Sequence, residues 1–181
     1  MGTLIGLRRW SVDSVDELLL AMGASFLELH QWMSWADTMP TRDLMLSVLR
    51  DDLAAFDADT GWQYFLYEIE SGELVGGAGL TRRGSPDELE VGYWVRSDRT
   101  GRGYATDASR MLTTAAFQSS LGINRVRISM DATNHASAAV PRRLGFHFVG
   151  ESERESSTLG RCQTIAVWEM DRANWIHVPT W

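Results

Sequence analysis

Apolar residues recur along the chain with two spacings, and these predict a mixed α/β domain. Short runs rich in β-branched and aromatic residues indicate strands, whereas apolar residues repeated every three or four positions indicate amphipathic helices. The predicted strands cover residues 3–10, 62–69, 73–82, 89–95, 125–130, 146–151 and 163–170. The predicted helices cover residues 15–22, 24–33, 41–56, 105–121 and 134–145. A sheet with flanking helices follows from this order.

Two of these helices begin at residues whose side chains can cap them. Thr41 and Asn134 each precede a helical pattern, and both residue types accept a hydrogen bond from a first-turn N–H group. The apolar face expected after Thr41 consists of Leu44, Leu46, Val48, Leu49, Leu53 and Phe56.

A single domain accounts for residues 1–181. That length suffices for one domain with a substantial core, and no repeat or low-complexity segment divides it. The end of the chain, from about residue 173, is a short Trp-rich tail with too little pattern to assign an element. Its tryptophans are candidates for a homodimer contact.

Composition and charge limit the classes of partner. Hydrophobic residues make up 44% of the chain and charged residues 23%, which is ordinary globular usage. The net charge of −7 argues against nonspecific nucleic-acid binding, which needs a basic face, and favours cationic substrates such as amines. No apolar run approaches the roughly 20 residues of a membrane span, and no signal pattern opens the chain. We expect a cytoplasmic protein with no nucleic-acid or membrane partner.

Cysteine and histidine usage predicts no metal site. Cys162 is the only cysteine, so the chain cannot form an internal disulfide or supply a cysteine-based zinc site. The histidines His135, His147 and His177 show no metal-ligand spacing with one another.

The stretch RTGRGYATDA at residues 99–108 places two glycines between a predicted strand and a predicted helix. Gly101 and Gly103 allow the backbone to approach a ligand closely, and the free N–H groups of the helix's first turn favour negative charge. A pyrophosphate suits such a turn. Similar turns occur without any phosphate ligand, and the chain has neither a P-loop nor a full dinucleotide-binding fingerprint. The motif gains meaning only from the rest of the chain.

Four segments, in order, resemble the GNAT superfamily of N-acetyltransferases, and within it the RimJ/RimL type. They are SFLELHQWMSWAD at residues 25–37, ELEVGYWVRSDRTGRGYATDA at 88–108, NHAS at 134–137 and RRLGF at 142–146. The resemblance covers nearly the whole chain. It implies a mostly antiparallel central sheet of about seven strands with flanking helices and a splayed fourth strand. It also implies acetyl-CoA as cosubstrate.

The resemblance assigns the glycine turn to the pyrophosphate of acetyl-CoA. The family pattern Q/R-x-x-G-x-G/A aligns with Thr100, Gly103 and Ala105, so the backbone N–H groups of residues 102–106 are expected to bind the phosphates. These residues are Arg102, Gly103, Tyr104, Ala105 and Thr106. Arg102 adds a positive charge unless it is simply a solvated surface residue. Thr100 departs from the pattern, and we expect it to weaken binding rather than abolish it.

The strand before the turn is expected to polarise the thioester. In the resembling family this strand bulges away from its neighbour and exposes N–H groups to the pantetheine arm and the thioester carbonyl. Carried over, these groups belong to Trp94 and Val95, and Gly92 is the easiest place for the bulge. The alternative is an unbroken core strand.

Four carboxylates are candidates for the base that deprotonates the acceptor amine. Glu90 matches an acidic position that relatives hold near the amine, provided that burial raises its pKa. Glu88 lies two residues away on the same face of the strand, and relatives also supply a base from the region of Glu153 and Glu155. The alternative for Glu90 is an ordinary acidic residue on a solvated face.

The helix after Asn134 carries the candidate acid. By resemblance, Asn134 binds the pantetheine arm, a role compatible with capping, and Ser137 protonates the departing thiolate. Pro141 lies inside this helix and is expected to kink or shorten it, which leaves its approach to the cofactor open.

The aromatic segment at residues 25–37 resembles the wall that receives the acceptor. We expect His30, Trp32 and Trp35 to bind the acceptor there, although a lone histidine is more often structural. The acceptor is either the α-amine of a protein N-terminus or a small amine, and it attacks directly in a ternary complex. Cys162 has no base signature that would favour a covalent intermediate. The alternative function is a noncatalytic acyl-CoA-binding sensor or carrier.

Overall fold

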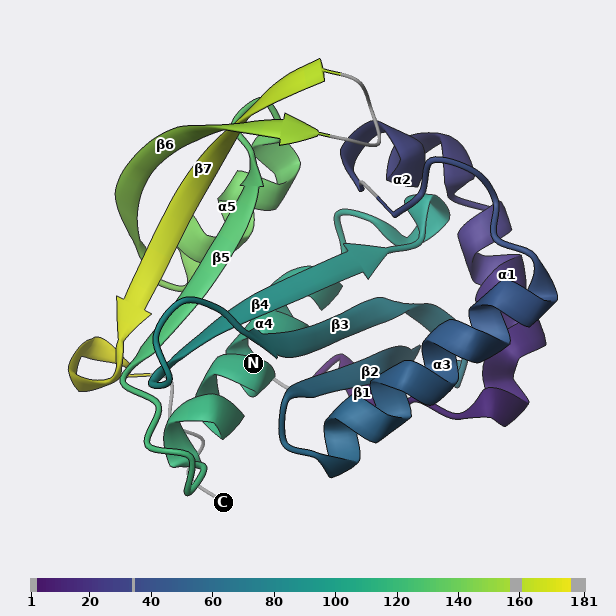
Figure 1. Ribbon diagram of the computed structural model, residues 1–181, viewed down its shortest axis with the longest axis horizontal. Coiled ribbons are helices and arrows are strands. Elements are labelled where there is room, and N and C mark those ends of the chain that lie inside the picture. Colours follow the sequence, from purple (N-terminus) through teal and green to yellow (C-terminus); the bar gives the residue numbers. More distant parts are fainter. Residues whose placement is uncertain (1–2, 34, 157–160, 177–181) are drawn as a thin grey trace.

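One sheet organises the molecule, in the strand order β1-β2-β3-β4-β5-β7-β6 (Figure 1). The computed structural model describes residues 3–33, 35–156 and 161–176, with the side chains of 154–156, 161 and 162 excepted. Within this part of the chain the seven strands are β1 (Ile5–Arg9), β2 (Gly61–Glu68), β3 (Leu74–Arg82), β4 (Glu88–Val95), β5 (Arg125–Asp131), β6 (His147–Ser156) and β7 (Arg161–Asp171). Neighbouring strands run antiparallel except β4 and β5. The predicted sheet is confirmed.

Helices cover both faces of this sheet. They are α1 (Val15–Gly23), α2 (Phe26–Trp32), α3 (Arg42–Asp57), α4 (Tyr104–Gln118) and α5 (His135–Arg143). Helices α1 and α3 pack over β2 and β3, whereas α4 and α5 lie behind β3, β4 and β5 in Figure 1. Among the described helices, none is both long and apolar enough to span a membrane.

The fourth strand splays from the fifth. Strands β4 and β5 pair only where Glu88, Leu89 and Glu90 lie opposite residues 125–127. Beyond Glu90 the two strands diverge, and β5 leans away from β4 with β7 and β6 beside it (Figure 1). The same stretch of β4 remains paired with β3 as far as Val95. One edge of β4 is therefore open along the second half of the strand.

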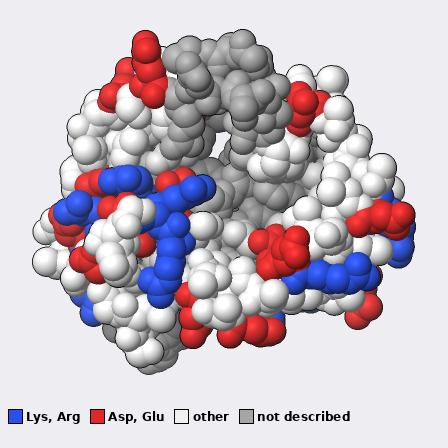
Figure 2. All heavy atoms as spheres, in the orientation of Figure 1, with Lys and Arg blue, Asp and Glu red and all other residues white. Residues whose placement is uncertain are grey.

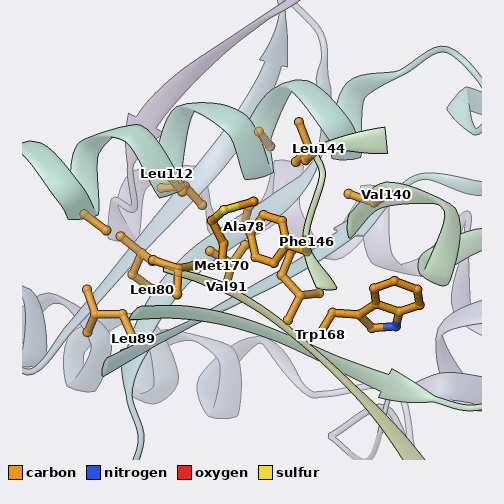
Figure 3. Close-up of a cluster of buried hydrophobic side chains, with 14 of the residues drawn as sticks. Ala78, Leu80, Leu89, Val91, Leu112, Val140, Leu144, Phe146, Trp168 and Met170 are labelled. Carbon is orange, nitrogen blue, oxygen red and sulfur yellow. The ribbon is translucent and has the colours of Figure 1, made fainter. Parts of the chain in front are cut away.

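Alternating side chains of the strands build one core on each face of the sheet. The larger core lies between the sheet and α4 and α5, where Leu89 and Val91 of β4 contact residues such as Leu112 and Phe146 (Figure 3). The smaller core fills the space under α1, α2 and α3 and includes Phe65. Period-two alternation along β4 thus sends successive side chains to different cores.

The beginning of the Trp-rich tail belongs to the larger core. The ring of Trp175 is buried between Phe117 and Phe146, and its Nε1 donates to Thr114 Oγ1 at 3.1 Å. Trp175 is therefore a packing residue rather than a candidate for a dimer contact. Residues 177–181 lie outside the described part of the chain, so the homodimer stays a prediction.

Element boundaries agree with the sequence pattern to within a few residues, but two of the six residues predicted for the apolar face of α3 are exposed. The Thr41 hydroxyl accepts from Leu44 N–H, as a cap should. Leu44, however, is 56% exposed and Val48 is exposed too, whereas Met45 and Leu49 are buried. Apolar residues on adjacent stripes of α3 gave two possible faces, and packing selected the Met45–Leu49 stripe.

Candidate active site

The open edge of β4 presents backbone groups that β5 does not use. Arg96 N–H donates to Val75 O of β3 at 2.8 Å, and successive residues of a strand direct their N–H groups to opposite edges. The N–H groups of Tyr93 and Val95 therefore face the opening, while the N–H of Trp94 faces β3. Because those two groups lie beyond the last β4–β5 pair, they are available to a carbonyl placed in the opening.

The first turn of α4 lies directly after this edge. Gly101 and Gly103 have φ values of +76° and +91°, a region that suits glycine, and Gly103 is the N-cap residue. Asp107 N–H is the first to bond within the helix, to Gly103 O at 2.9 Å. The N–H groups of residues 104–106 have no intrahelical acceptor and so form an anion site. The predicted phosphate turn therefore has the required backbone.

Acidic side chains lie close to this turn. Arg102 Nη1 is 3.6 Å from Glu68 Oε1, and the Tyr104 hydroxyl donates to the same carboxylate. Hydrogen bonds from Ser71 and Tyr104, together with nearby arginines, lower the pKa of Glu68. Burial and the bond to Glu68 raise the pKa of Tyr104. Arg102 is thus paired with Glu68 at the turn. The Tyr104 hydroxyl is bound to the same carboxylate, so the backbone N–H of Tyr104, rather than its side chain, is left for an anion.

Thr100, which departs from the family pattern, stabilises the turn locally. Its Oγ1 donates to Ser97 O at 3.0 Å, and its backbone is extended. Ser97 N–H in turn donates to the buried Ser25 Oγ at 2.9 Å, which links the phosphate turn to the segment before α2. The threonine side chain is therefore occupied with the protein's own backbone.

Helix α5 carries Ser137 to the open part of β4. The Asn134 side chain caps the helix by accepting from Ser137 N–H at 2.9 Å. The Tyr93 hydroxyl lies 3.0 Å from Ser137 Oγ and 3.1 Å from Ser137 O. Burial raises the pKa of Tyr93 to about 12. The helix is short, at nine residues, as expected from Pro141, and it ends soon after the proline.

The candidate carboxylates differ sharply in their partners. Glu90 is partly buried, and its Oε2 lies 3.9 Å from Arg83 Nε, a long and exposed contact. Glu88 is almost fully buried, with its Oε1 3.3 Å from Arg127 Nη1. Arg127 also donates to Glu169 at 2.5 Å. Glu88 is therefore part of an ion network, whereas the one ion pair of Glu90 among the described residues is its long contact with Arg83.

The two remaining carboxylates lie on β6. Glu153 is exposed to solvent, and the side chain of Glu155 lies outside the described part of the chain, as does that of Cys162. An exposed carboxylate keeps its ordinary solvation, so Glu153 offers no feature that would adapt it to abstract a proton.

The predicted acceptor wall corresponds to α2 and the turn after it. His30 Nδ1 lies 2.9 Å from Ala36 O, so a neutral His30 donates from Nδ1 and leaves Nε2 as an acceptor. Trp32 is partly buried at the end of α2, and Trp35 is 48% exposed. Figure 2 shows the surface hollowed where β4 and β5 part, with basic and acidic side chains interleaved on the side of β5 and β7.

A comparison with protein families decides the class of this site. Residues 5–147 match the family model described as an acetyltransferase (GNAT) domain, which is most of the chain. The chain belongs to the GNAT acetyltransferase family. It is an N-acetyltransferase, and the mostly antiparallel seven-stranded sheet of its described residues matches the GNAT fold.

Several similar proteins are described as ribosomal N-acetyltransferases. The chain is 29% identical over 153 residues to "Putative ribosomal N-acetyltransferase YdaF" of Bacillus subtilis, covering 81% of this chain and 80% of that one. RimL, a ribosomal alpha-N-protein acetyltransferase in complex with coenzyme A, superposes with a TM-score of 0.85 at 19% identity, covering 94% and 95%. An acetyltransferase of Salmonella typhimurium that modifies the N-terminal serine of a ribosomal protein gives 0.80 at 18%, covering 94% and 96%. The two structures share the fold.

Sequence reasoning missed Tyr93 in this GNAT domain. The strand and the helix capped by Asn134 were predicted correctly, but Tyr93 counted only as a strand-forming residue. The contact joins positions 44 residues apart, so no local pattern shows it. The available signal was alternation, because Tyr93 shares a face of β4 with Val91 and hence points to the helices behind the sheet.

Among the described residues, no three His, Cys, Asp or Glu side chains gather as a metal site.

Proposed function

We propose that this protein transfers the acetyl group of acetyl-CoA to a primary amine by direct attack, with the α-amine of a protein N-terminus as the acceptor. One observation carries the proposal. The open edge of β4 lies between the first turn of α4, which suits a pyrophosphate, and Ser137 at the start of α5. An extended ligand with a phosphate at one end and a reactive thioester at the other matches this arrangement.

The donor would lie along the opening. The N–H groups of residues 102–106 bind the pyrophosphate, with Arg102 adding charge, and the pantetheine arm enters between β4 and β5. One of the two N–H groups at this edge, that of Tyr93 or that of Val95, then polarises the thioester carbonyl, and the other binds a carbonyl of the pantetheine arm. A RimL structure that holds coenzyme A on the same fold supports this position for the donor.

The chemistry needs one group to take a proton and one to give it. The neutral amine attacks the carbonyl carbon, a C–N bond forms, and the electron pair of the breaking C–S bond goes to sulfur. Glu90 accepts the proton that the new amide nitrogen loses, and Ser137 protonates the thiolate. Glu90 is the best-placed base because Glu88 is bound to Arg127.

An N-terminal α-amine is the favoured acceptor for two reasons. The names of the similar proteins specify ribosomal and N-terminal acceptors. In addition, the net charge of −7 attracts a cationic amine, and the wall of α2 supplies His30, Trp32 and Trp35 for contacts beyond the reacting nitrogen. A peptide offers such contacts, whereas a minimal amine does not.

The test is an acceptor screen with acetyl-CoA, read by the mass shift of the acceptor and by free thiol release. One arm contains peptides with a free N-terminus, and a matched arm contains the same peptides with a blocked N-terminus and an internal lysine. A third arm contains amino acids and polyamines. We expect a mass shift and equal thiol release in the first arm. Binding of acetyl-CoA without thiol release in any arm would instead identify a noncatalytic acyl-CoA-binding module.

A further inference from the structure

The hydroxyl groups of Tyr93 and Ser137 form a pair beside the opening. The Tyr93 oxygen lies 3.0 Å from Ser137 Oγ and 3.1 Å from Ser137 O, so two polar atoms of one residue surround a single phenol. A phenol carries one hydrogen, so it can donate to only one of these atoms at a time. When it donates to Ser137 Oγ, the hydrogen of Ser137 is free to point into the opening.

The location of the pair matches the departing sulfur. Tyr93 belongs to the part of β4 that has no β5 partner, and Ser137 lies in the first turn of α5, behind the same opening. Tyr93 is partly buried and packs against the larger core, and the contacts of its hydroxyl with Ser137 hold the phenol in place. The pair thus spans the opening from the strand to the helix.

We propose that Tyr93 is a positioning residue that forms a two-hydroxyl relay with Ser137. Ser137 passes its proton to the sulfur as the C–S bond breaks, and the Ser137 oxygen takes the phenol proton of Tyr93. After the products leave, Glu90 releases its proton to water and water returns a proton to the Tyr93 oxygen, so both groups regain their starting states. The relay rests on the proposed acetyl transfer, and it explains why a serine, a weak acid, can serve as the donor.

Burial sets the starting state of the relay. Because burial raises the pKa of Tyr93 to about 12, its hydroxyl is protonated near neutral pH. The relay therefore begins with a protonated phenol, and no other group has to protonate Tyr93 first.

The test compares Tyr93→Phe with the parent chain and with Tyr64→Phe. Phenylalanine keeps the ring and removes only the hydroxyl, and Tyr64 lies on β2 against Phe56, away from α5. In single turnovers with saturating acetyl-CoA we expect Tyr93→Phe to lower the rate at least about tenfold. The KM for acetyl-CoA should stay within about twofold, and Tyr64→Phe should leave both values unchanged.

Two further readouts separate a relay from a role in packing. Ser137→Ala and the double variant Tyr93→Phe/Ser137→Ala should lower the single-turnover rate by the same factor, because the two hydroxyls act as one unit. The rate in mixtures of light and heavy water should indicate two protons in motion for the parent and one for Tyr93→Phe. A packing role would instead raise the KM for acetyl-CoA, add to the loss in Ser137→Ala and leave the isotope dependence unchanged.

If Tyr93→Phe does not fold, replacement of all four tyrosines by 3-fluorotyrosine keeps the shape of the site and makes the phenol more acidic. The relay predicts a changed single-turnover rate, and an unchanged rate overturns it. Thiol release at the parental rate by Tyr93→Phe overturns the relay alone. A parent chain that releases no thiol with any amine overturns the acetyl transfer and the relay together.

Discussion

The two halves of β4 are built differently although they belong to one strand. In the first half, Glu88 to Glu90, all three residues pair with β5, and Leu89 and Glu90 also pair with β3. The Glu88 carboxylate contacts Arg127, which also binds Glu169 of β7. The second half, from Val91 to Val95, is paired only with β3 and carries Tyr93 beside Ser137. Charge fixes the closed half, whereas close backbone packing fixes the open half.

The first half of β4 therefore stabilises the fold, whereas the second half is open to a ligand, although the whole strand has only eight residues. A buried ion network tolerates no ligand, because it is already satisfied, and it holds β4 and β5 together up to the point where they part. The open half leaves N–H groups and hydroxyls unsatisfied by β5, so a ligand can use them. Glu90 marks the transition, since it is the last paired residue and the candidate base.

The close approach of β3 holds the open half of β4 in place. Gly76→Ala should disrupt this packing. A Cβ at Gly76 would lie 2.2 Å from Trp94 O, a backbone atom that cannot move aside. We expect a loss of about 3 kcal/mol in the free energy of unfolding, measured by chemical denaturation. Gly92→Ala is the matched control, because nothing lies within 4 Å of its Cβ position, and it should change stability by less than about 0.5 kcal/mol. Equal stability of the two variants would contradict the close packing.

Substitution at the transition tests whether Glu90 belongs to the chemistry. Glu90→Gln should lower kcat/KM about 100-fold at neutral pH, which corresponds to about 2.7 kcal/mol. The deficit should shrink at high pH, because the amine is then already neutral. The control is Glu153→Gln, which changes an exposed carboxylate of β6 and should have no effect. A loss in Glu153→Gln with none in Glu90→Gln would transfer the role of base to β6.

The closed half should weaken when its arginine is removed. Arg127→Met leaves Glu88 and Glu169 buried without their shared partner, with side-chain exposures of 8% and 7%. Because Arg127 itself is partly exposed, we expect a loss of about 2 kcal/mol rather than the larger value of a fully buried pair. Arg42→Met removes an exposed pair with Asp16 and should cost at most about 0.5 kcal/mol. Comparable losses in the free energy of unfolding of both variants would show that the partly buried Arg127 network stabilises the fold no more than the exposed Arg42–Asp16 pair.

The sequence allowed prediction of the sheet, most of the helices and the phosphate turn, because each rests on a local signal. Strand-like runs, the Thr41 and Asn134 caps and the paired glycines all act within a few residues of themselves. The open edge of β4 followed from the family resemblance rather than from residue spacing. The two α3 stripes show the limit, since only packing distinguishes Leu44 from Met45.

The features of the fold and of the site that were not predicted depend on contacts between residues far apart in sequence. The Tyr93–Ser137 pair, the binding of Glu88 by Arg127 and the burial of Trp175 each join elements that are far apart in sequence. The direction of the Trp94 N–H depends on the register between β3 and β4. Such features follow from the assembled fold and have no local signature.

The smallest expected effect concerns the helix turn that holds Ser137 over the open half. Asn134→Ala removes the side-chain cap of α5 and should cost about 1 kcal/mol of stability. Thr41→Ala removes the equivalent cap of α3, far from the opening, and should cost a similar amount. Both variants are compared by thermal unfolding and by kcat at a temperature where each is fully folded. Only Asn134→Ala should lower kcat, by several-fold, since its lost bond ends on Ser137 N–H. Equal kcat values in the two variants would mean that the cap stabilises α5 without positioning Ser137.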